Sequence, residues 1–282
     1  MPGTLFVVAT PIGNLEDVTA RALRVLREVT IIAAEDTRRT AQLLSRYDIH
    51  TPTTSLHEHN EGRKAPALIG RLQSGENVAL VSDAGTPTIS DPGSRLIKAA
   101  IDAGIRVEAV PGPSAPLAAL AVSGFPTKTF TFLGFPPVRA RDRAEWFAAL
   151  RAAGRTVVFF EAPHRIRKTL EELRANVGDV GICVARELTK VHEELVRGPI
   201  TAVLNSLVTP RGEFTIAVNI GHTTESNRAI VPSPEELALE FCALTNTGTL
   251  SRRAVIRELA RKYGASQRQI YTVIEHAKSS GK

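Results

Sequence analysis

The stretch LFVVATPIGN, residues 5–14, joins the apolar run LFVVA to a loop of small residues and proline. Similar apolar runs follow at 31–35, 53–56, 78–82 and 107–110. Segments with helical periodicity separate them, as at 18–29 and 92–103, where apolar positions fall on one face. Strands that alternate with helices in this way predict an α/β domain built on a parallel sheet with helices on its faces.

Each predicted strand ends in a loop of small, polar or proline residues. The five loops are ATPIGN at 9–14, EDTR at 35–38, HEHNE at 57–61, SDAGTP at 82–87 and PGPSA at 111–115. Ligands of open parallel sheets collect beyond the carboxyl ends of the strands, and small residues let a ligand approach the backbone. The five loops therefore predict a shared ligand site.

Two common nucleotide motifs are missing from these loops. The Gly-x-Gly-x-x-Gly pattern of dinucleotide-binding folds does not follow the first strand, and no Gly-x-x-x-x-Gly-Lys-Ser/Thr stretch is present. The sequence therefore favours neither a nicotinamide cofactor nor a nucleoside triphosphate.

A second domain begins near the stretch FPTKTFTFLGFPP, where the pattern of the first domain stops. Its clearest strands are TVVFFEA at 156–162, GICVAR at 181–186 and FTIAVNI at 214–220. Residues 221–236 are rich in turn formers and predict a linker. Helical segments at 237–244, 252–263 and 266–276 follow it, with the rhythm of a small bundle or a helix-turn-helix. The predicted domains are 1–124, 125–222 and 235–282.

The positive charge of the chain is concentrated at its C-terminal end. The net charge is +6 overall, and residues 251–282 carry eight basic residues against two acidic ones, so the preceding 250 residues balance to zero. A basic tail on a neutral body predicts a polyanionic partner, because cationic side chains release phosphate counterions on binding. A solvated basic helix surface would give the same charge.

The composition is that of an ordinary soluble globular chain, with 43% hydrophobic and 23% charged residues in 282. The early apolar run is broken by Pro11 and Gly13 and does not resemble a signal peptide. No window approaches the roughly 20 apolar residues of a membrane span. Two cysteines, without the spacing of a metal site, indicate a reducing compartment, so we expect a cytoplasmic protein without a metal centre.

Six motifs, in this order, resemble those of the ribosomal RNA small subunit methyltransferase I family, within the tetrapyrrole-methylase-like superfamily. They are PIGN, EDTR, SDAGTP, PGPS, EAPHR at 161–165 and RELTK at 186–190. The resemblance implies two α/β domains of the tetrapyrrole methylase type, with S-adenosylmethionine in the cleft between them and a small helix-turn-helix-like module at the C-terminus. It also implies a homodimer that methylates a ribose 2′-hydroxyl of a cytidine in the decoding region of 16S ribosomal RNA, within the 30S subunit.

The resemblance also implies which residues contact the cofactor. Carried over by motif, they are Pro11, Asp83, Ala84, Gly85, Thr86, Ile89, Ser114, Ala115, Phe160 and Leu188. S-adenosylmethionine carries a sulfonium and an amino acid end but no phosphate. Small-residue loops with an acid such as Asp83 suit it better than a lysine-bearing phosphate cradle.

Methyl transfer to a hydroxyl needs an in-line approach and gains from a nearby base. Candidates at strand ends are Glu35, Asp36, His57, Glu58 and His59, of which we place Asp36, His57 and Glu58 near the acceptor. An ion pair between Asp36 and Arg38 is the structural alternative for the EDTR motif, and surface or capping roles are the alternative for the histidines.

Cations in the motifs and in the basic tail are candidates for binding RNA phosphates. They are Arg38, Arg39, Arg165, Lys190, Arg252 and Arg253. For the four motif residues, salt bridges across the domain cleft are the alternative.

Two other functions compete with RNA methylation. A methyltransferase of the same fold could modify a carbon of a tetrapyrrole, although such an enzyme does not need a basic helical tail. A nucleic-acid-binding regulator could use the α/β body to sense a ligand and would bind duplex DNA through the tail.

Overall fold

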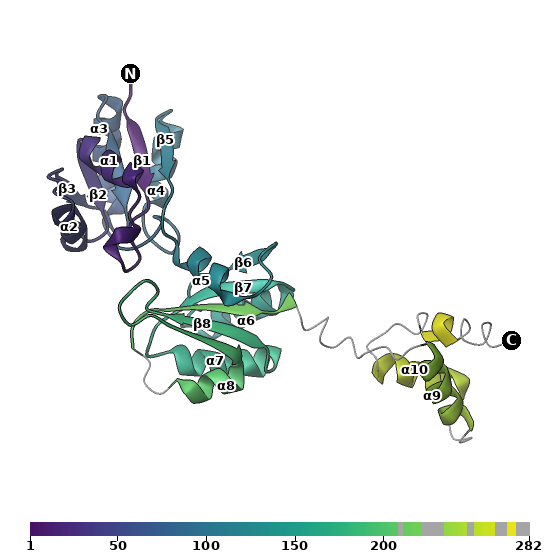
Figure 1. Cartoon of the computed structure of the whole chain (residues 1–282). Helices are drawn as coiled ribbons and strands as arrows, with labels where there is room; N and C mark the ends of the chain where they lie inside the picture. The colour runs from purple at the N-terminus through teal and green to yellow at the C-terminus, as the bar shows by residue number, and fades with distance from the viewer. Residues whose placement is uncertain (208–210, 222–233, 247–250, 263–269, 275–282) are drawn as a thin grey trace. The chain divides into compact units, whose positions relative to one another are not determined.

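The computed structural model describes residues 1–207, 211–221, 234–246, 251–262 and 270–274. The chain divides into two compact units, Met1–Asn219 and Ile220–Lys282. The first unit contains two five-stranded sheets, and the elements described in the second are helices (Figure 1). The predicted α/β fold with a C-terminal helical region is confirmed.

The first sheet is entirely parallel, with strand order β3-β2-β4-β1-β5. Its strands are β1 (Thr4–Val8), β2 (Ile31–Ala34), β3 (Thr53–Ser55), β4 (Val78–Val81) and β5 (Arg106–Val110). Each bound lies within one residue of the prediction. The inner strands β2 and β4 are buried along their whole length, as expected for a sheet covered on both faces.

Helices cover both faces of this sheet because successive strand residues point to opposite sides. Ile32 belongs to the apolar cluster that contains α1 (Ala20–Glu28) and α2 (Thr37–Arg46). Ala33, its neighbour, belongs to the cluster that contains α3 (Glu61–Gln73) and α4 (Ser94–Asp102). A short 3-10 helix, η1 (Leu15–Asp17), follows the first loop. The loops at the carboxyl ends of the strands therefore lie at one edge of a rigid two-sided core.

The second sheet is mixed, with strand order β6-β7-β10-β8-β9. Its strands are β6 (Phe130–Phe132), β7 (Thr156–Glu161), β8 (Gly181–Arg186), β9 (Glu194–Pro199) and β10 (Phe214–Asn219). Strand β10 lies antiparallel between β7 and β8. The three predicted strands are present, whereas β6 and β9 are edge strands that the sequence pattern did not define.

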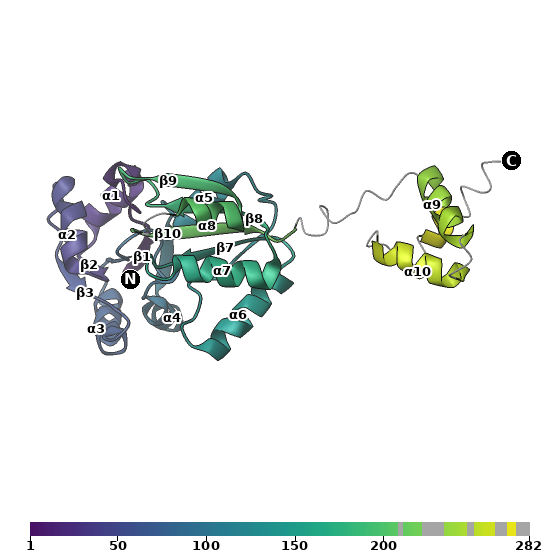
Figure 2. The ribbon, with the colours of Figure 1, turned by 90° about the horizontal axis from the view of Figure 1, so that it is seen from below.

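Four helices accompany the second sheet: α5 (Ala115–Ser123), α6 (Ala140–Ala152), α7 (Ile166–Val177) and α8 (Ile200–Ser206). Leu120 of α5 packs with Val158 and Ala217, which point to one face. Trp146 of α6 packs on Phe159, which points to the other face. Helices α6 and α7 run beside each other (Figure 2). Helix α5 packs on strands β7, β8 and β10 of the second sheet, although its residues fall within the range 1–124 of the first predicted domain.

The second unit has its own apolar cluster. Helices α9 (Pro234–Asn246) and α10 (Arg252–Lys262) contribute Leu237, Phe241, Val255 and Leu259, and a helical stretch at 270–274 adds Ile270 and Ile274. The helices predicted at 237–244 and 252–263 are present. Most of the predicted linker, and parts of the third predicted helix, lie outside the described residues. In the described ranges no helix is long and apolar enough to cross a membrane.

Candidate active site

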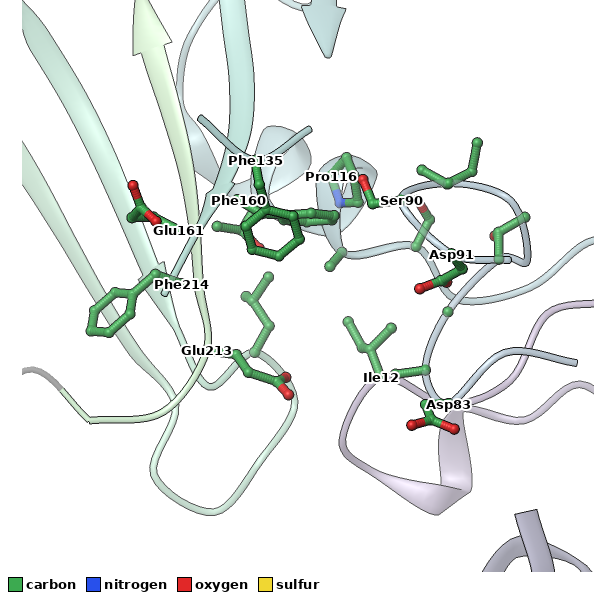
Figure 3. A pocket seen from close by; sticks show the side chains of 18 of the residues that line it. Ile12, Asp83, Ser90, Asp91, Pro116, Phe135, Phe160, Glu161, Glu213 and Phe214 are labelled. Atoms are coloured by element: carbon green, nitrogen blue, oxygen red, sulfur yellow. The ribbon is translucent and has the colours of Figure 1, made fainter. Parts of the chain in front are cut away.

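A cavity of about 430 Å³ lies in the first unit, between loops of the two sheets (Figure 3). The loops that follow β2, β4 and β5 line one side, and the ends of β7, β8 and β10 line the other. We call it the central cavity. Its volume is in the range of about 300–1,000 Å³ found for small-molecule sites.

Nine of the ten residues expected to contact a cofactor line this cavity. They are Asp83, Ala84, Gly85, Thr86, Ile89, Ser114, Ala115, Phe160 and Leu188. The tenth, Pro11, lines a neighbouring cavity together with Ile12 and Asp83, which border the central cavity as well. The fold thus gathers residues that are distant in sequence around one space.

Backbone hydrogen bonds fix the loops of the first sheet against one another. Thr10 and Gly85 exchange N–H to carbonyl hydrogen bonds of 2.9 and 3.0 Å. The Thr86 hydroxyl donates to the Pro113 carbonyl at 3.2 Å. Gly85 has a φ of 80°, a left-handed conformation that favours glycine. The loops after β1, β4 and β5 therefore form one connected shelf under the cavity.

Unusual backbone conformations are concentrated beside the central cavity. Of the five described non-glycine residues with a left-handed φ, Thr88 and Ser90 lie in the loop after β4, and Glu187 and Thr189 lie in the loop after β8. Such conformations cost about 1–3 kcal/mol each and persist where the surroundings impose them. Both loops contribute lining residues to the cavity.

Loops of the two α/β halves touch beside the cavity. The backbone N–H of Asn14 donates to the Thr189 hydroxyl at 3.0 Å. A Cβ atom placed on Gly13 would lie 2.8 Å from the Leu188 carbonyl oxygen. Glycine at this position therefore allows the loop after β1 to meet the loop after β8.

Carboxylates dominate the lining of the central cavity. Among the described lining residues Arg39 is the one cation, against five acids: Glu35, Asp83, Asp91, Glu161 and Glu213. Arg39 lies 3.5 Å from Asp83, and Arg165 neutralises Glu161 at 3.1 Å. The remaining negative charge favours a cationic ligand over a phosphate-bearing one.

Burial changes the acidity of two of these carboxyl groups. Desolvation raises the pKa of Glu35, whose carboxylate accepts the backbone N–H of Asp83 at 3.3 Å. Desolvation, with added repulsion from Glu35 and Asp83, raises the pKa of Asp91 to about 6. Asp91 was not among the predicted residues. It lies in the same long loop as the SDAGTP motif, in a second Ser-Asp pair.

An aromatic wall completes the second-sheet side of the cavity. The ring of Phe160 lies 5.0 Å from that of Phe132 and 5.2 Å from that of Phe135. Figure 3 shows Phe135 and Phe160 on the side of the cavity opposite Asp83. Apolar and aromatic surface facing an acidic shelf fits an adenosine that carries a sulfonium and an ammonium group.

The residues expected near the acceptor separate into two groups. His57 and Glu58 line an adjoining cavity of about 580 Å³, which we call the histidine cavity. Asp36 lines neither cavity: its side chain caps α2 and pairs with Arg38 at 2.7 Å. The hydrogen bond from Arg38 lowers the pKa of Asp36 to about 2, which makes it a weak base.

The predicted RNA-binding cations also differ in their surroundings. Arg38 is exposed, and Arg39 lines the central cavity. Arg165 is held by Glu161 and the Pro136 carbonyl, and Lys190 by Glu187 at 2.9 Å and Glu213 at 3.1 Å, so these two stabilise loops. Arg252 and Arg253 begin α10 in the second unit and are exposed. Within the described ranges no group of three side chains suited to a metal ion was found.

Known proteins share this sequence and this fold. Residues 4–204 match the family model of Tetrapyrrole (Corrin/Porphyrin) Methylases. A protein of Synechocystis sp. is 42% identical over 282 residues, covering 99% of this chain and 100% of the relative, and one of Xylella fastidiosa is 52% identical over 222 residues, covering 77% and 81%. Both are named ribosomal RNA small subunit methyltransferase I.

Solved structures with low sequence identity share the fold. Diphthine synthase has a TM-score of 0.61 at 16% identity, covering 77% of this chain and 89% of the other. Uroporphyrin-III C-methyltransferase of Thermus thermophilus, complexed with S-adenyl homocysteine, has a TM-score of 0.55 at 18% identity, covering 78% and 99%.

The two sheets and the loop-lined cavity define a methyltransferase of the tetrapyrrole methylase class. S-adenosylmethionine is the cofactor of this class, and the acidic shelf and aromatic wall fit it. Within the class, the chain belongs to the ribosomal RNA small subunit methyltransferase I family.

Proposed function

We propose that this chain transfers a methyl group from S-adenosylmethionine to the ribose 2′-hydroxyl of a cytidine in the decoding region of 16S ribosomal RNA. It acts in the cytoplasm, as a homodimer, on the RNA within the 30S subunit. The names of its relatives support the ribosomal RNA substrate, while the cytidine and its 2′-oxygen are what the resemblance of the six motifs to that family implies.

The observation that carries the proposal is a pair of adjoining cavities. The central cavity fits the methyl donor, and the histidine cavity beside it shares three lining residues with it. A transferase needs two reactants held side by side with the reacting atoms in line. Adjoining cavities of this size supply places for both.

On the donor side, the chain binds and orients the cofactor. S-adenosylmethionine supplies an electrophilic methyl group on a cationic sulfur. The loop at residues 83–86 and Ser114 hold the polar end, while Phe160 and Leu188 contact the apolar parts. Pro11 supports the shelf from the neighbouring cavity.

On the acceptor side, His57 and Glu58 contact the target nucleotide in the histidine cavity. Arg39, which lines the central cavity, and the exposed Arg38 attract the flanking phosphates, and Asp36 holds Arg38 in place. Arg252 and Arg253 of the second unit bind RNA phosphates farther from the target. Counterion release from these contacts adds affinity without selecting a sequence.

The lining of both cavities opposes the rival tetrapyrrole substrate. Biosynthetic tetrapyrroles carry several carboxylates, and the histidine cavity presents Glu58 and Glu61 in addition to the shared Glu35 and Asp91. Like charges at close range disfavour a ligand with carboxylates around its ring, whereas the sugar and base of a cytidine are uncharged and can enter without their phosphates. The net charge of +6 in residues 251–282 is unexplained by a small-molecule substrate and suits RNA.

Label transfer tests the proposal directly. The protein is incubated with tritiated-methyl S-adenosylmethionine and 30S subunits from cells that lack it, with naked 16S RNA, 50S subunits and a uroporphyrinogen as alternative acceptors. We expect label on 30S subunits alone. Label on the tetrapyrrole would contradict the proposal, and so would absence of label on every RNA acceptor.

A pair of glycine variants ties the label to the central cavity. Gly85 and Gly104 have left-handed φ values of 80° and 69°, so alanine strains the backbone similarly at both. A Cβ on Gly85 lies 3.4 Å from Ile12 at the cavity, whereas at Gly104 it meets no described atom within 4 Å. We expect Gly85→Ala to reduce transfer about tenfold more than Gly104→Ala.

A further inference from the structure

The border between the two cavities contains three residues. Glu35, Ser90 and Asp91 line both the central cavity and the histidine cavity. In-line transfer places the acceptor oxygen between its own binding site and the methyl carbon. A group that receives the hydroxyl proton must therefore lie at this border.

Geometry distinguishes the two carboxylates at the border. Glu35 accepts the backbone N–H of Asp83 and so connects the loops after β2 and β4. Asp91 follows Ser90, whose φ of 68° is left-handed, and precedes Pro92. Figure 3 shows the Asp91 side chain directed into the cavity. The left-handed turn at Ser90 thus presents Asp91 at the border, where the Ser82 side chain hydrogen-bonds its carboxylate and lowers its pKa, whereas Glu35 connects two loops.

The other acids and bases near the acceptor are less well placed. His57 and Glu58 line the histidine cavity but are not among the residues that line the central cavity. Asp36 is bound to Arg38 and lines neither.

We propose that Asp91 is the catalytic base, taking the proton of the acceptor hydroxyl as its oxygen is methylated. This inference rests on the proposed function and assigns a residue to its chemical step. The hydroxyl oxygen forms a bond to the methyl carbon while the carbon–sulfur bond breaks. The electron pair of the broken carbon–sulfur bond stays on sulfur, which becomes a neutral thioether. The hydroxyl proton passes to the Asp91 carboxylate.

The surroundings of Asp91 suit this role. Its pKa of about 6 leaves the carboxylate mostly ionised at neutral pH, yet makes it a stronger base than an exposed aspartate. The charged and titratable groups that line the two cavities with it are Glu35, Arg39, Asp83, Glu161 and Glu213, and His57, Glu58, His59, Glu61 and Arg95. Of these, Glu35 and Asp83 raise the pKa of Asp91 by repulsion.

The test compares Asp91→Asn with the wild-type chain in single-turnover transfer to 30S subunits from pH 5 to 9. We expect the variant to be slower by about 10²–10⁴-fold, the usual contribution of a general base. Calorimetry should give a cofactor Kd within twofold of wild type. The wild-type rate should fall tenfold per pH unit below about 6, because protonated Asp91 cannot accept a proton.

Two further variants separate a base from a structural residue. Asp102→Asn removes an exposed carboxylate of α4 that pairs with Lys98, and should keep the wild-type rate and pH profile. Glu35→Gln should lower the rate and keep an acidic limb, shifted to lower pH because Glu35 no longer raises the pKa of Asp91 by repulsion. The Asp91→Asn rate should instead lack that acidic limb and rise with hydroxide concentration.

The outcomes are distinguishable from failure of the proposed function. If wild type methylates the 2′-hydroxyl and Asp91→Asn retains more than a third of its rate, Asp91 is not the base. The inference is also overturned if the variant loses cofactor affinity in proportion to its rate, or if its acidic limb persists. If wild type labels no ribose oxygen, the proposed function itself fails.

Discussion

Glu161 is a carboxylate whose side chain is fully buried at the edge of the central cavity. Three donors surround it: the Arg165 guanidinium, the Thr169 hydroxyl and the backbone N–H of Ala162. Arg165 also donates to the Pro136 carbonyl, in the loop that carries Phe135. The Glu161–Arg165 ion pair therefore joins β7 to the loop that carries Phe135 of the aromatic wall.

Replacing Arg165 by glutamine should destabilise the protein by about 3 kcal/mol, since it leaves a buried carboxylate without its counter-charge. Urea denaturation measures the change. The matched double variant Glu161→Gln/Arg165→Gln should recover at least half of the loss, because neither charge is then buried alone. Weaker RNA binding with unchanged stability would show instead that Arg165 contacts RNA, as its motif suggests.

At the level of single residues, the sequence located the cofactor site better than it identified the catalytic residues. The resemblance of its motifs to a known family identified nine residues that line the central cavity. Asp91 escaped because its altered acidity comes mainly from burial, with repulsion from Glu35 in another loop and from Asp83 in its own loop, and burial is not visible in the sequence. The EDTR motif suggested Asp36 as a base. In the structure Asp36 is the N-cap of α2 and accepts the backbone N–H of Arg38, so its carboxylate is already engaged.

Between elements, the loops after β1 and β8 meet beside the central cavity, which Ile12 of the first loop and Leu188 of the second both line. The backbone N–H of Asn14 in one loop donates to the Thr189 hydroxyl in the other, and Gly13 has no room for a side chain. A methyl group there would lie 2.5 Å from the Lys190 Cγ and 2.8 Å from the Leu188 carbonyl oxygen. Lys190 is itself held by Glu187 and Glu213.

Gly13→Ala should therefore push the two loops apart and displace Leu188 from the cavity wall. We expect the cofactor Kd to rise about tenfold, equivalent to about 1.4 kcal/mol. Gly70→Ala is the control, because a Cβ there meets no described atom within 4 Å and alanine favours the helix interior. Calorimetric titration with the cofactor measures the Kd of both variants. Equal affinities would mean that the loop contact does not shape the cofactor site.

Elements were predictable where local pattern and tertiary environment agree. The five strands of the first sheet are apolar runs between breakers, and they lie where predicted. Helix α5 is apolar on every side, so its sequence did not show which sheet it covers. Strand β9 is a partly exposed edge strand of sequence ELVRGP, which pairs with the preceding strand β8 but lacks the apolar run that marks the inner strands.

At the scale of the whole molecule, two units have separate cores. The apolar cluster of the second unit is formed by α9, α10 and residues 270–274, and the sheets of the first unit have clusters of their own. The central cavity is lined by residues of the first unit alone. The basic excess lies in the second unit.

Removing residues 222–282 should therefore leave the cofactor Kd within twofold of the full chain and weaken RNA binding. The salt dependence of RNA affinity should become shallower by about 0.7–0.9 per lost phosphate contact. Calorimetry measures the cofactor affinity. Filter binding at salt concentrations from about 50 to about 300 mM KCl measures the salt dependence of RNA affinity. Equal loss of cofactor affinity would contradict this division of labour.

Full-length variants provide the matched charge control. Arg253 and Arg257 are exposed and one turn apart on α10. Replacing both by glutamine should reduce the salt slope by about 1.4–1.8, as expected for two phosphate contacts. Replacing the exposed Arg24 and Arg141 of the first unit removes the same charge and should change the slope much less.

The central claim is the chemical position of the transferred methyl group. The direct measurement is mass spectrometry of nucleosides released from 16S RNA, after wild-type protein has acted on 30S subunits from cells lacking it. We predict 2′-O-methylcytidine, recovered in one fragment of the decoding region and absent without the protein. A methyl group on a base, or no methylated nucleoside above the untreated control, would contradict the account.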